Sequence, residues 1–134
     1  MNREEMTAFV PSREWQEALS YGESLPGAVF DHPFEEDFVT TVLRHRGNRK
    51  WFGLLMRVPG RKIGRAELPF VDLLNLKCAP EDAIIARELF AGILPAYHMS
   101  KTHWITVVLD GSVPGEFRDR LMAKSYMLTR GKKG

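Results

Sequence analysis

The sequence predicts an α+β fold, a two-layer sandwich in which helices cover one face of an antiparallel β-sheet. The chain of 134 residues has the length of one domain with a buried core, and we expect a single domain over residues 1–134. Segments rich in β-branched and aromatic residues follow one another through short turns, which favours antiparallel pairing. Segments with apolar residues at helical spacing stand before, between and after them, as packing on a sheet requires.

The first helix is predicted to begin after Ser12, a residue type that caps helix N-termini. Trp15 and Leu19 give this helix an apolar side, and the following Pro and Gly should end it by Ser24. Residues 1–11 are expected to form a loose lead-in.

Four segments have strand composition, namely residues 38–46, 51–58, 71–78 and 104–109. Gly47-Asn48 is a strong turn pattern between the first two, so these should form a hairpin. The expected element order is therefore helix, three or four strands, helix, strand, helix.

Two further helices are predicted by their first residues. Pro80 opens one with acidic residues in its first turn, and Pro114 opens the last. In the last helix, three residues should share one face: Phe117, Leu121 and Ser125. The ordered core is expected over residues 12–128, with a loose end at 130–134.

Strand alternation predicts that the two faces of the sheet differ. One face of the second strand should be apolar and covered by helices: Phe52, Leu54, Met56 and Val58. The opposite, open face should be mixed and should carry four residues with aromatic or polar side chains: Trp51, Arg57, Asn75 and Lys77. Such a face could dock a ligand or could be an ordinary solvated face.

Charge is distributed unevenly along the chain although the net charge is only +2. The first 37 residues hold nine acidic and two basic residues, whereas residues 38–65 hold eight basic residues and no acidic one. These eight are Arg44, Arg46, Arg49, Lys50, Arg57, Arg61, Lys62 and Arg65. A basic hairpin over residues 44–65 could reach phosphates, or it could be a solvated edge that avoids pairing with other strands.

The single cysteine, Cys78, excludes an intramolecular disulfide and is expected in the core. The N-terminus lacks the apolar segment of a signal peptide, and no apolar run is long enough to span a bilayer. We therefore expect a cytoplasmic protein without a membrane partner.

Catalytic and metal-binding patterns are weak. His98 and His103 stand five residues apart without a third ligand nearby, so no metal site is expected. Neither Ser100 nor Ser112 lies in a nucleophile elbow, and residues 58–64 lack the spacing of a phosphate-binding loop. The sequence predicts no catalytic residue, no cofactor and no enzymatic activity.

Several segments together resemble one family. They are Leu25-Pro26-Gly27, Asp31-His32-Pro33-Phe34, Lys50-Trp51-Phe52, Leu76 to Pro80, Pro95 to Val107, Asp110 to Pro114, and Ser125-Tyr126. In these segments, over about residues 15–128, the chain resembles the MmcQ/YjbR family of small bacterial proteins. Five residues of the most distinctive segment form a family motif without an assigned role: Tyr97, His98, Lys101, His103 and Trp104.

The resemblance implies a two-layer α/β fold that has been compared with a double-wing DNA-binding arrangement and with secretion chaperones. It implies no catalytic activity, and the DNA-binding label rests on structural analogy. This chain departs from the family pattern in a long and basic connection over residues 57–67.

Two functions therefore remain open, and a small-molecule enzyme that uses the Tyr97–Trp104 segment is a distant third. The first is DNA or other nucleic-acid binding, with contacts from Arg44, Arg46, Arg49, Lys50, Trp51, Arg57, Arg61, Lys62, Arg65, Asn75 and Lys77. The second is a protein-interaction or chaperone-like adaptor that uses the open sheet face. Either could be a monomer or a homodimer.

Overall fold

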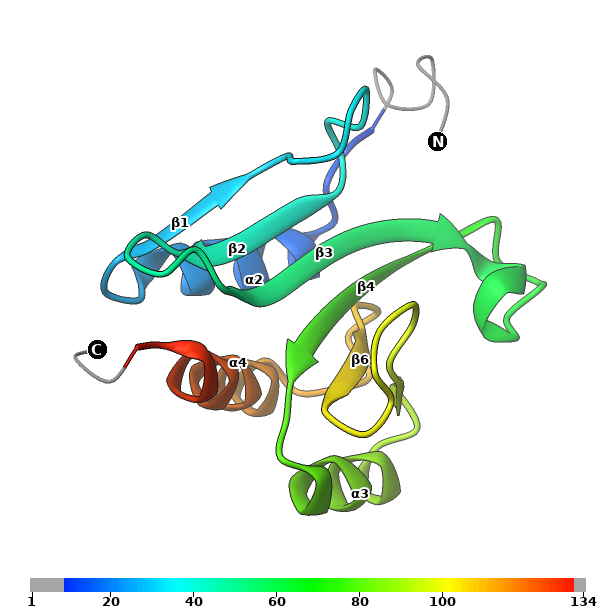
Figure 1. Cartoon of the computed structure of the whole chain (residues 1–134). Coiled ribbons are helices and arrows are strands. Elements are labelled where there is room, and N and C mark those ends of the chain that lie inside the picture. Colours follow the sequence, from blue (N-terminus) through cyan, green and yellow to red (C-terminus); the bar gives the residue numbers. More distant parts are fainter. Residues whose placement is uncertain (1–8, 132–134) are drawn as a thin grey trace.

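The computed structural model describes residues 9–131. Its helices are α2 (Arg13–Ser24), α3 (Pro80–Leu89) and α4 (Gly115–Thr129), with a short 3-10 helix η1 (Gly60–Ile63). Its strands are β1 (Ala28–Asp31), β2 (Thr41–His45), β3 (Trp51–Pro59), β4 (Phe70–Lys77), β5 (Ile93–Pro95) and β6 (Trp104–Val108). Figure 1 shows the long β3 and β4 curving away from the helices toward η1.

The six strands form one open sheet in the order β1-β2-β3-β4-β6-β5, and every neighbouring pair is antiparallel. Buried apolar residues from each of α2, α3 and α4 form one cluster with one face of this sheet. The predicted α+β sandwich with helices on one face is therefore confirmed.

The helices begin where the sequence predicts. Ser12 caps α2, because its hydroxyl accepts a hydrogen bond from the Trp15 N–H at 3.2 Å. Pro80 stands in the first turn of α3, where its missing N–H costs nothing, and Pro114 precedes α4. Leu121 and Ser125 of α4 are buried, as the predicted face requires.

The predicted helix-covered row of β3 is wrong for Leu54, Met56 and Val58, and a β-bulge interrupts its alternation. Leu43 pairs with Gly53 and Arg44 pairs with Trp51, so Phe52 is the extra residue of a β-bulge. Phe52 therefore lies in the helix-side core, whereas Leu54, Met56 and Val58 belong to a second apolar cluster. The apolar row that the sequence assigns to one face is divided between the two.

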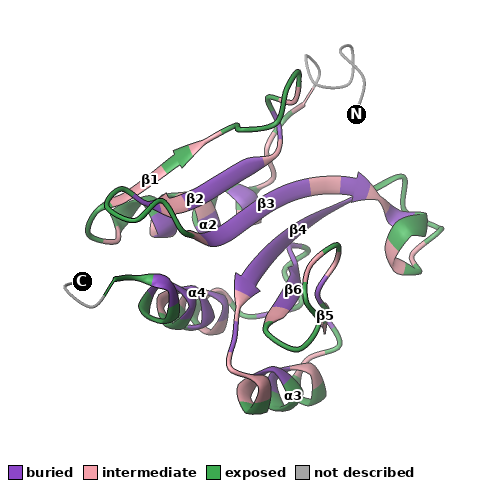
Figure 2. Ribbon diagram, viewed as in Figure 1, coloured by how far each residue is buried: buried purple, intermediate pink, exposed green. Residues whose placement is uncertain are grey.

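The second cluster lies on the face away from the helices, which we call the loop-covered face. Val42, Leu54 and Leu73 are buried there although none of the three α-helices belongs to this cluster. The residues packed against it come from strands, loops and η1: Trp51, Ile63, Leu94, Tyr97 and Met99. Figure 2 shows buried residues along most of β3 and β4, so the face expected to be open is largely filled.

Two short strands were not predicted, β1 and β5, and both lie at sheet edges. The predicted strand over residues 38–46 is shorter, because Phe38 lies in the preceding loop with 73% of its surface exposed. The other three predicted strands are confirmed within one residue at each end.

The predicted loose ends lie partly outside the described residues, since residues 1–8 and 132–134 are not described. Of the lead-in that is described, Phe9 packs edge-on against Trp15 at 5.0 Å between ring centroids. Within residues 9–131, no helix has the length and apolar character needed to cross a membrane.

Candidate functional site

The basic residues of the predicted hairpin lie at the two ends of β3 rather than in one patch. The β2–β3 turn holds Arg46, Arg49 and Lys50, whereas the β3–β4 connection holds Arg61, Lys62 and Arg65. The nine residues of β3 separate these groups by up to roughly 30 Å along the strand. The two turns that carry these charges therefore lie at opposite ends of β3.

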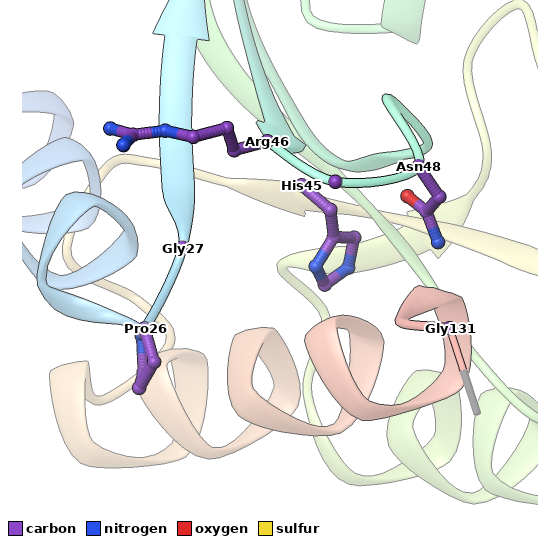
Figure 3. A pocket seen from close by; sticks show the side chains of 7 residues that line it. Pro26, Gly27, His45, Arg46, Asn48 and Gly131 are labelled. Atoms are coloured by element: carbon purple, nitrogen blue, oxygen red, sulfur yellow. The ribbon is translucent and has the colours of Figure 1, made fainter. Parts of the chain in front are cut away.

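At the β2–β3 turn, side chains alternate between structural and exposed positions (Figure 3). His45 is buried and lies 2.8 Å from the Thr129 hydroxyl, measured from Nε2. The Asn48 amide donates to the Thr129 carbonyl at 3.0 Å and so caps the end of α4. Arg46 extends away across β1, which leaves its guanidinium exposed.

The pocket in Figure 3 has a volume of about 350 Å³ and is lined by the turn, the α2–β1 loop and Gly131. The His45 imidazole in this lining contacts Thr129 of α4, and burial lowers the pKa of His45. Since Gly131 leads into residues outside the described range, this pocket carries no functional assignment.

Acidic residues neutralise part of the β2–β3 end. Asp31 accepts hydrogen bonds from Arg44 at 3.0 and 3.2 Å, and it lies 3.7 Å from Arg49. The Arg44 guanidinium also lies 5.7 Å from the ring centroid of Trp51. Arg46 and Lys50 take part in no ion pair within residues 9–131.

Arg57 does not lie on the loop-covered face, where the sequence placed it with Asn75. Its guanidinium donates to both carboxylate oxygens of Asp72, at 2.6 and 3.0 Å, and covers the ring of Phe9 at 4.4 Å. Asp72 also accepts from the Ser12 hydroxyl at the start of α2, so the pair belongs to the helix side. These contacts give Arg57 a structural role.

The β3–β4 connection is compact where it leaves β3. A Cβ on Gly60 would lie 2.2 Å from the carbonyl oxygens of both Arg65 and Leu68. The Arg65 N–H donates to the Gly60 carbonyl at 2.8 Å, which closes the loop around η1. Arg61 and Lys62 are exposed on this loop and take part in no ion pair among the described residues.

Arg65 is paired with Asp110 at 3.1 Å, which ties the connection to the turn after β6. Burial raises the pKa of Asp110, but hydrogen bonds from Ser112 and the charge of Arg65 outweigh burial and hold it below its ordinary value.

Asn75 is fully buried and anchors the segment that follows β5. Its amide donates to the Tyr97 carbonyl at 2.8 Å, and its carbonyl accepts from the Thr106 hydroxyl at 2.6 Å. The Thr106 oxygen in turn accepts the Tyr97 N–H at 2.9 Å. Both backbone polar groups of Tyr97 are thus fixed by the side chains of Asn75 and Thr106, and Asn75 is not exposed for contact with a ligand.

His98 follows Tyr97 and has a left-handed backbone conformation, with φ of 58°. That conformation costs a non-glycine residue about 1–2 kcal/mol, so the neighbouring contacts must hold it. The imidazole stacks on the Tyr97 ring with 4.0 Å between centroids and 11° between planes. Lys101 donates to the Ala96 carbonyl at 2.9 Å and places its ammonium at the same rim.

A pocket of about 340 Å³ joins this segment to the β3–β4 connection. It is lined by Lys62, Ile63, Leu94, Pro95, Ala96, Tyr97, His98, Lys101 and Thr106. Lys62 of the predicted basic hairpin and His98 and Lys101 of the motif therefore meet at one place. No acidic side chain is among these lining residues.

The rest of the motif lies beyond this pocket. The side chain of His103 is exposed, and its backbone carbonyl accepts the Cys78 N–H at 2.8 Å. Trp104 is half-buried and pairs across the sheet with Lys77, which by alternation lies on the loop-covered face. Because His98 and His103 are both exposed, their side chains contribute little to the folding core.

The phenylalanines of the β1–β2 loop were not among the predicted contact residues. Phe34 packs edge-on against Trp51 at 6.0 Å, and both Phe34 and Phe38 are exposed. The sequence signal for them was the position of Phe34 and Phe38 shortly before the basic segment that begins at Arg44. Within residues 9–131, no three metal-ligating side chains gather at one point.

The chain matches known proteins over most of its length. It is 42% identical over 106 residues to the uncharacterized protein YyaQ of Bacillus subtilis, a match that covers 78% of this chain and 87% of that protein. It is 40% identical over 53 residues to the uncharacterized protein YjbR of Escherichia coli, which covers 40% of this chain and 45% of that protein.

Solved structures agree with the fold. A crystal structure of a Pseudomonas syringae protein superposes with a TM-score of 0.80 at 39% identity, covering 89% of this chain and 99% of that one. A Deinococcus radiodurans protein gives a TM-score of 0.65 at 29% identity, covering 86% and 77%. The YjbR family model matches residues 23–128. The resemblance carried by the Tyr97–Trp104 motif is thereby confirmed, and the chain belongs to the YjbR family.

Proposed function

We propose that this protein binds DNA through phosphate contacts made by exposed cations at the two ends of β3. The observation that carries the proposal is that Arg46, Lys50, Arg61 and Lys62 are exposed and unpaired by acids within the described residues. Phosphate contacts of this kind supply most non-specific affinity for nucleic acids and require no base recognition.

Several residues of the predicted contact set have a supporting role in this proposal. Arg57 and Arg65 are held by Asp72 and Asp110, and Asn75 is buried. Arg44 is held by Asp31, so we assign it to positioning Trp51 rather than to a phosphate. Trp51 and Lys77 remain available at the margin of the loop-covered face.

The alternative of a protein adaptor on the open sheet face has less support. The apolar residues of that face, such as Leu54, Met56 and Leu73, are at most 8% exposed. A protein interface normally offers an apolar centre that becomes buried on association, and here that surface is already covered by loops.

Salt dependence of DNA binding tests the proposal. Four phosphate contacts predict that the logarithm of affinity for duplex DNA falls with the logarithm of salt concentration at a slope of about −3.6. The double variant Arg61→Glu/Lys62→Glu should weaken binding at least tenfold and flatten the slope by about two.

A matched control reverses two exposed cations of α4, Arg120→Glu/Lys124→Glu, with the same change in net charge. This variant should bind nearly as the unaltered protein does. Equal losses of affinity in both variants would mean that net charge alone causes the effect, which would contradict the proposed contacts. Absence of binding to duplex or single-stranded DNA at low salt would refute the proposal.

A further inference from the structure

The pocket between the β3–β4 connection and the 96–101 segment has the features of a ligand site. Its volume of about 340 Å³ lies within the range of small-molecule pockets. One wall is apolar, from Ile63, Leu94 and Ala96, and the rim carries Lys62, His98 and Lys101. Nothing in the phosphate contacts proposed for DNA requires a pocket here.

The floor of this pocket is polar but already satisfied. The Thr106 hydroxyl donates to the Asn75 side-chain carbonyl and accepts from the Tyr97 N–H. Thr106 itself is fully buried. A ligand must therefore find its polar partners at the rim. There, Lys101 has one donor committed to the Ala96 carbonyl, which leaves two for a ligand and holds the ammonium in place.

The charge of the rim selects an anion. Two ammonium groups and an imidazole line the pocket and no carboxylate does. A phosphate monoester carries a charge between −1.5 and −2 near neutral pH and offers three acceptor oxygens, which suits these three groups. A phosphodiester within a strand carries only one charge and continues on both sides, so it fits a pocket less well than a terminal phosphate.

The stacked Tyr97 and His98 rings indicate which group the phosphate is attached to. Tyr97 and His98 stack nearly parallel, at 11° between planes, and the left-handed backbone of His98 keeps the imidazole in this position. Stacked rings beside an apolar wall offer a flat surface to a planar ring, as aromatic platforms do for nucleobases. A strained, non-glycine backbone at a pocket rim is a common feature of binding sites.

We propose that this pocket binds the phosphate monoester of a nucleotide, with Lys62, His98 and Lys101 on the phosphate and Tyr97 and His98 beside the base. The group could belong to a free mononucleotide or to the 5′ end of a DNA strand. The site shares Lys62 with the proposed contacts to internal phosphates, but it goes beyond those contacts and needs none of the other three cations.

Titration of the full-length, ¹⁵N-labelled protein with adenosine monophosphate, adenosine and inorganic phosphate tests the site. We expect the monophosphate to shift amide resonances of residues 62–63 and 94–106 at millimolar concentration or below. Adenosine and inorganic phosphate should each bind at least tenfold more weakly. If the monophosphate causes no shifts in these residues, the proposal is wrong.

Variants separate the rim from the fold. Lys62→Met and Lys101→Met each remove an exposed ammonium and should weaken monophosphate binding at least fivefold, with an unchanged circular dichroism spectrum. Lys124→Met on α4 is the matched control and should bind normally. Unchanged binding in both rim variants would contradict the assignment.

Oligonucleotides distinguish the two sources of the phosphate. Stronger binding of a 5′-phosphorylated strand than of its 5′-hydroxyl counterpart, lost in Lys101→Met, identifies the strand end. Monophosphate binding without this preference identifies a free nucleotide. Monophosphate binding without any oligonucleotide binding would support the pocket and refute the DNA-binding function, so the two proposals fail separately.

Discussion

The two ends of β3 hold their positive charges in different ways. At the β2–β3 turn, Asp31 lies beside Arg44 and Arg49, and Asn48 ties the turn to the end of α4. At the other end, Arg61 and Lys62 stand on a loop whose backbone is tightly closed, and Lys62 faces a pocket without acidic residues. Each end is thus partly neutralised, the first by Asp31 and the second by Asp110, but at the second end no carboxylate lines the pocket beside Lys62.

The difference shows that equal numbers of basic residues do not make equal binding surfaces. An exposed cation next to a carboxylate has less favourable energy to gain from a phosphate, because the carboxylate repels the phosphate. A cation on a closed loop also loses less conformational freedom on binding than one on a mobile loop. We therefore assign the larger share of anion binding to the β3–β4 end.

The largest expected effect on stability comes from a glycine substitution that compares the packing of the β3–β4 connection with that of the β2–β3 turn. In Gly60→Ala the new Cβ would meet two backbone carbonyl oxygens at 2.2 Å, so the loop must open. We expect the free energy of unfolding to fall by about 3 kcal/mol, the upper end for overpacking. Urea denaturation measures this loss.

Gly47→Ala is the matched control at the β2–β3 turn. A Cβ there has no heavy atom within 4 Å among the described residues, and its φ is not in the left-handed region. A change below about 0.5 kcal/mol is expected. Similar losses in both variants would contradict the contrast in loop closure.

The second expected effect compares Asn48, which anchors the β2–β3 turn to α4, with Asn75, which anchors the Tyr97 wall of the pocket beside the β3–β4 connection. Asn75→Ala removes buried hydrogen bonds to Tyr97 and Thr106 and should cost about 2–3 kcal/mol. Asn48→Ala removes an exposed cap on Thr129 and should cost about 1 kcal/mol. Thermal unfolding of both variants measures the two losses of stability. A larger loss for Asn48→Ala would contradict the stronger anchoring that we assign to Asn75.

Between pH 7 and 5, a pH effect is expected from His45 at the β2–β3 end. Burial lowers the pKa of His45 from its ordinary 6.5, so the unfolded chain takes up a proton at a higher pH than the folded one. The stability contributed by neutral His45 is therefore present above about pH 6.5 and is lost as pH falls toward the folded pKa.

His45→Gln should flatten the dependence of the melting temperature on pH between 7 and 5. The pKa of Asp37 and that of Asp110 are lowered from 3.8, so their contributions are lost below this range. A variant that keeps the full slope would assign the titration to another group.

The smallest expected effect on stability is at the pocket rim. His98 is exposed and its backbone is left-handed, so His98→Gly removes strain while it loses the stack on Tyr97. We expect the melting temperature to change little, although adenosine monophosphate binding should weaken. A large loss of stability would make the Tyr97–His98 stack part of the folding core instead.

The sequence was sufficient for the elements with strong local patterns. Ser12, Pro80 and the apolar composition of β3 and β4 defined helix starts and strands that the structure retains. The edge strands β1 and β5 were missed because each has only three or four residues, too few for a periodic pattern.

The arrangement of the site depended on tertiary contacts that no local pattern encodes. The bulge at Phe52 places Trp51 against the loop-covered face, opposite to the face that a regular strand would give it. Lys62 and Lys101 meet at one pocket although 38 residues separate them, and Arg57 turned to Asp72 on the helix side. Charge counts predicted which residues could bind an anion but not which of them come together.

DNA affinity of two double variants tests the contrast between the ends most directly. Fluorescence anisotropy at fixed low salt would compare Arg61→Glu/Lys62→Glu with Arg46→Glu/Lys50→Glu, which change net charge equally at opposite ends of β3. A loss at least several-fold greater for Arg61→Glu/Lys62→Glu is predicted, because no carboxylate lines the pocket beside Lys62. Equal losses, or a greater loss for Arg46→Glu/Lys50→Glu, would contradict the assignment of anion binding to the β3–β4 end.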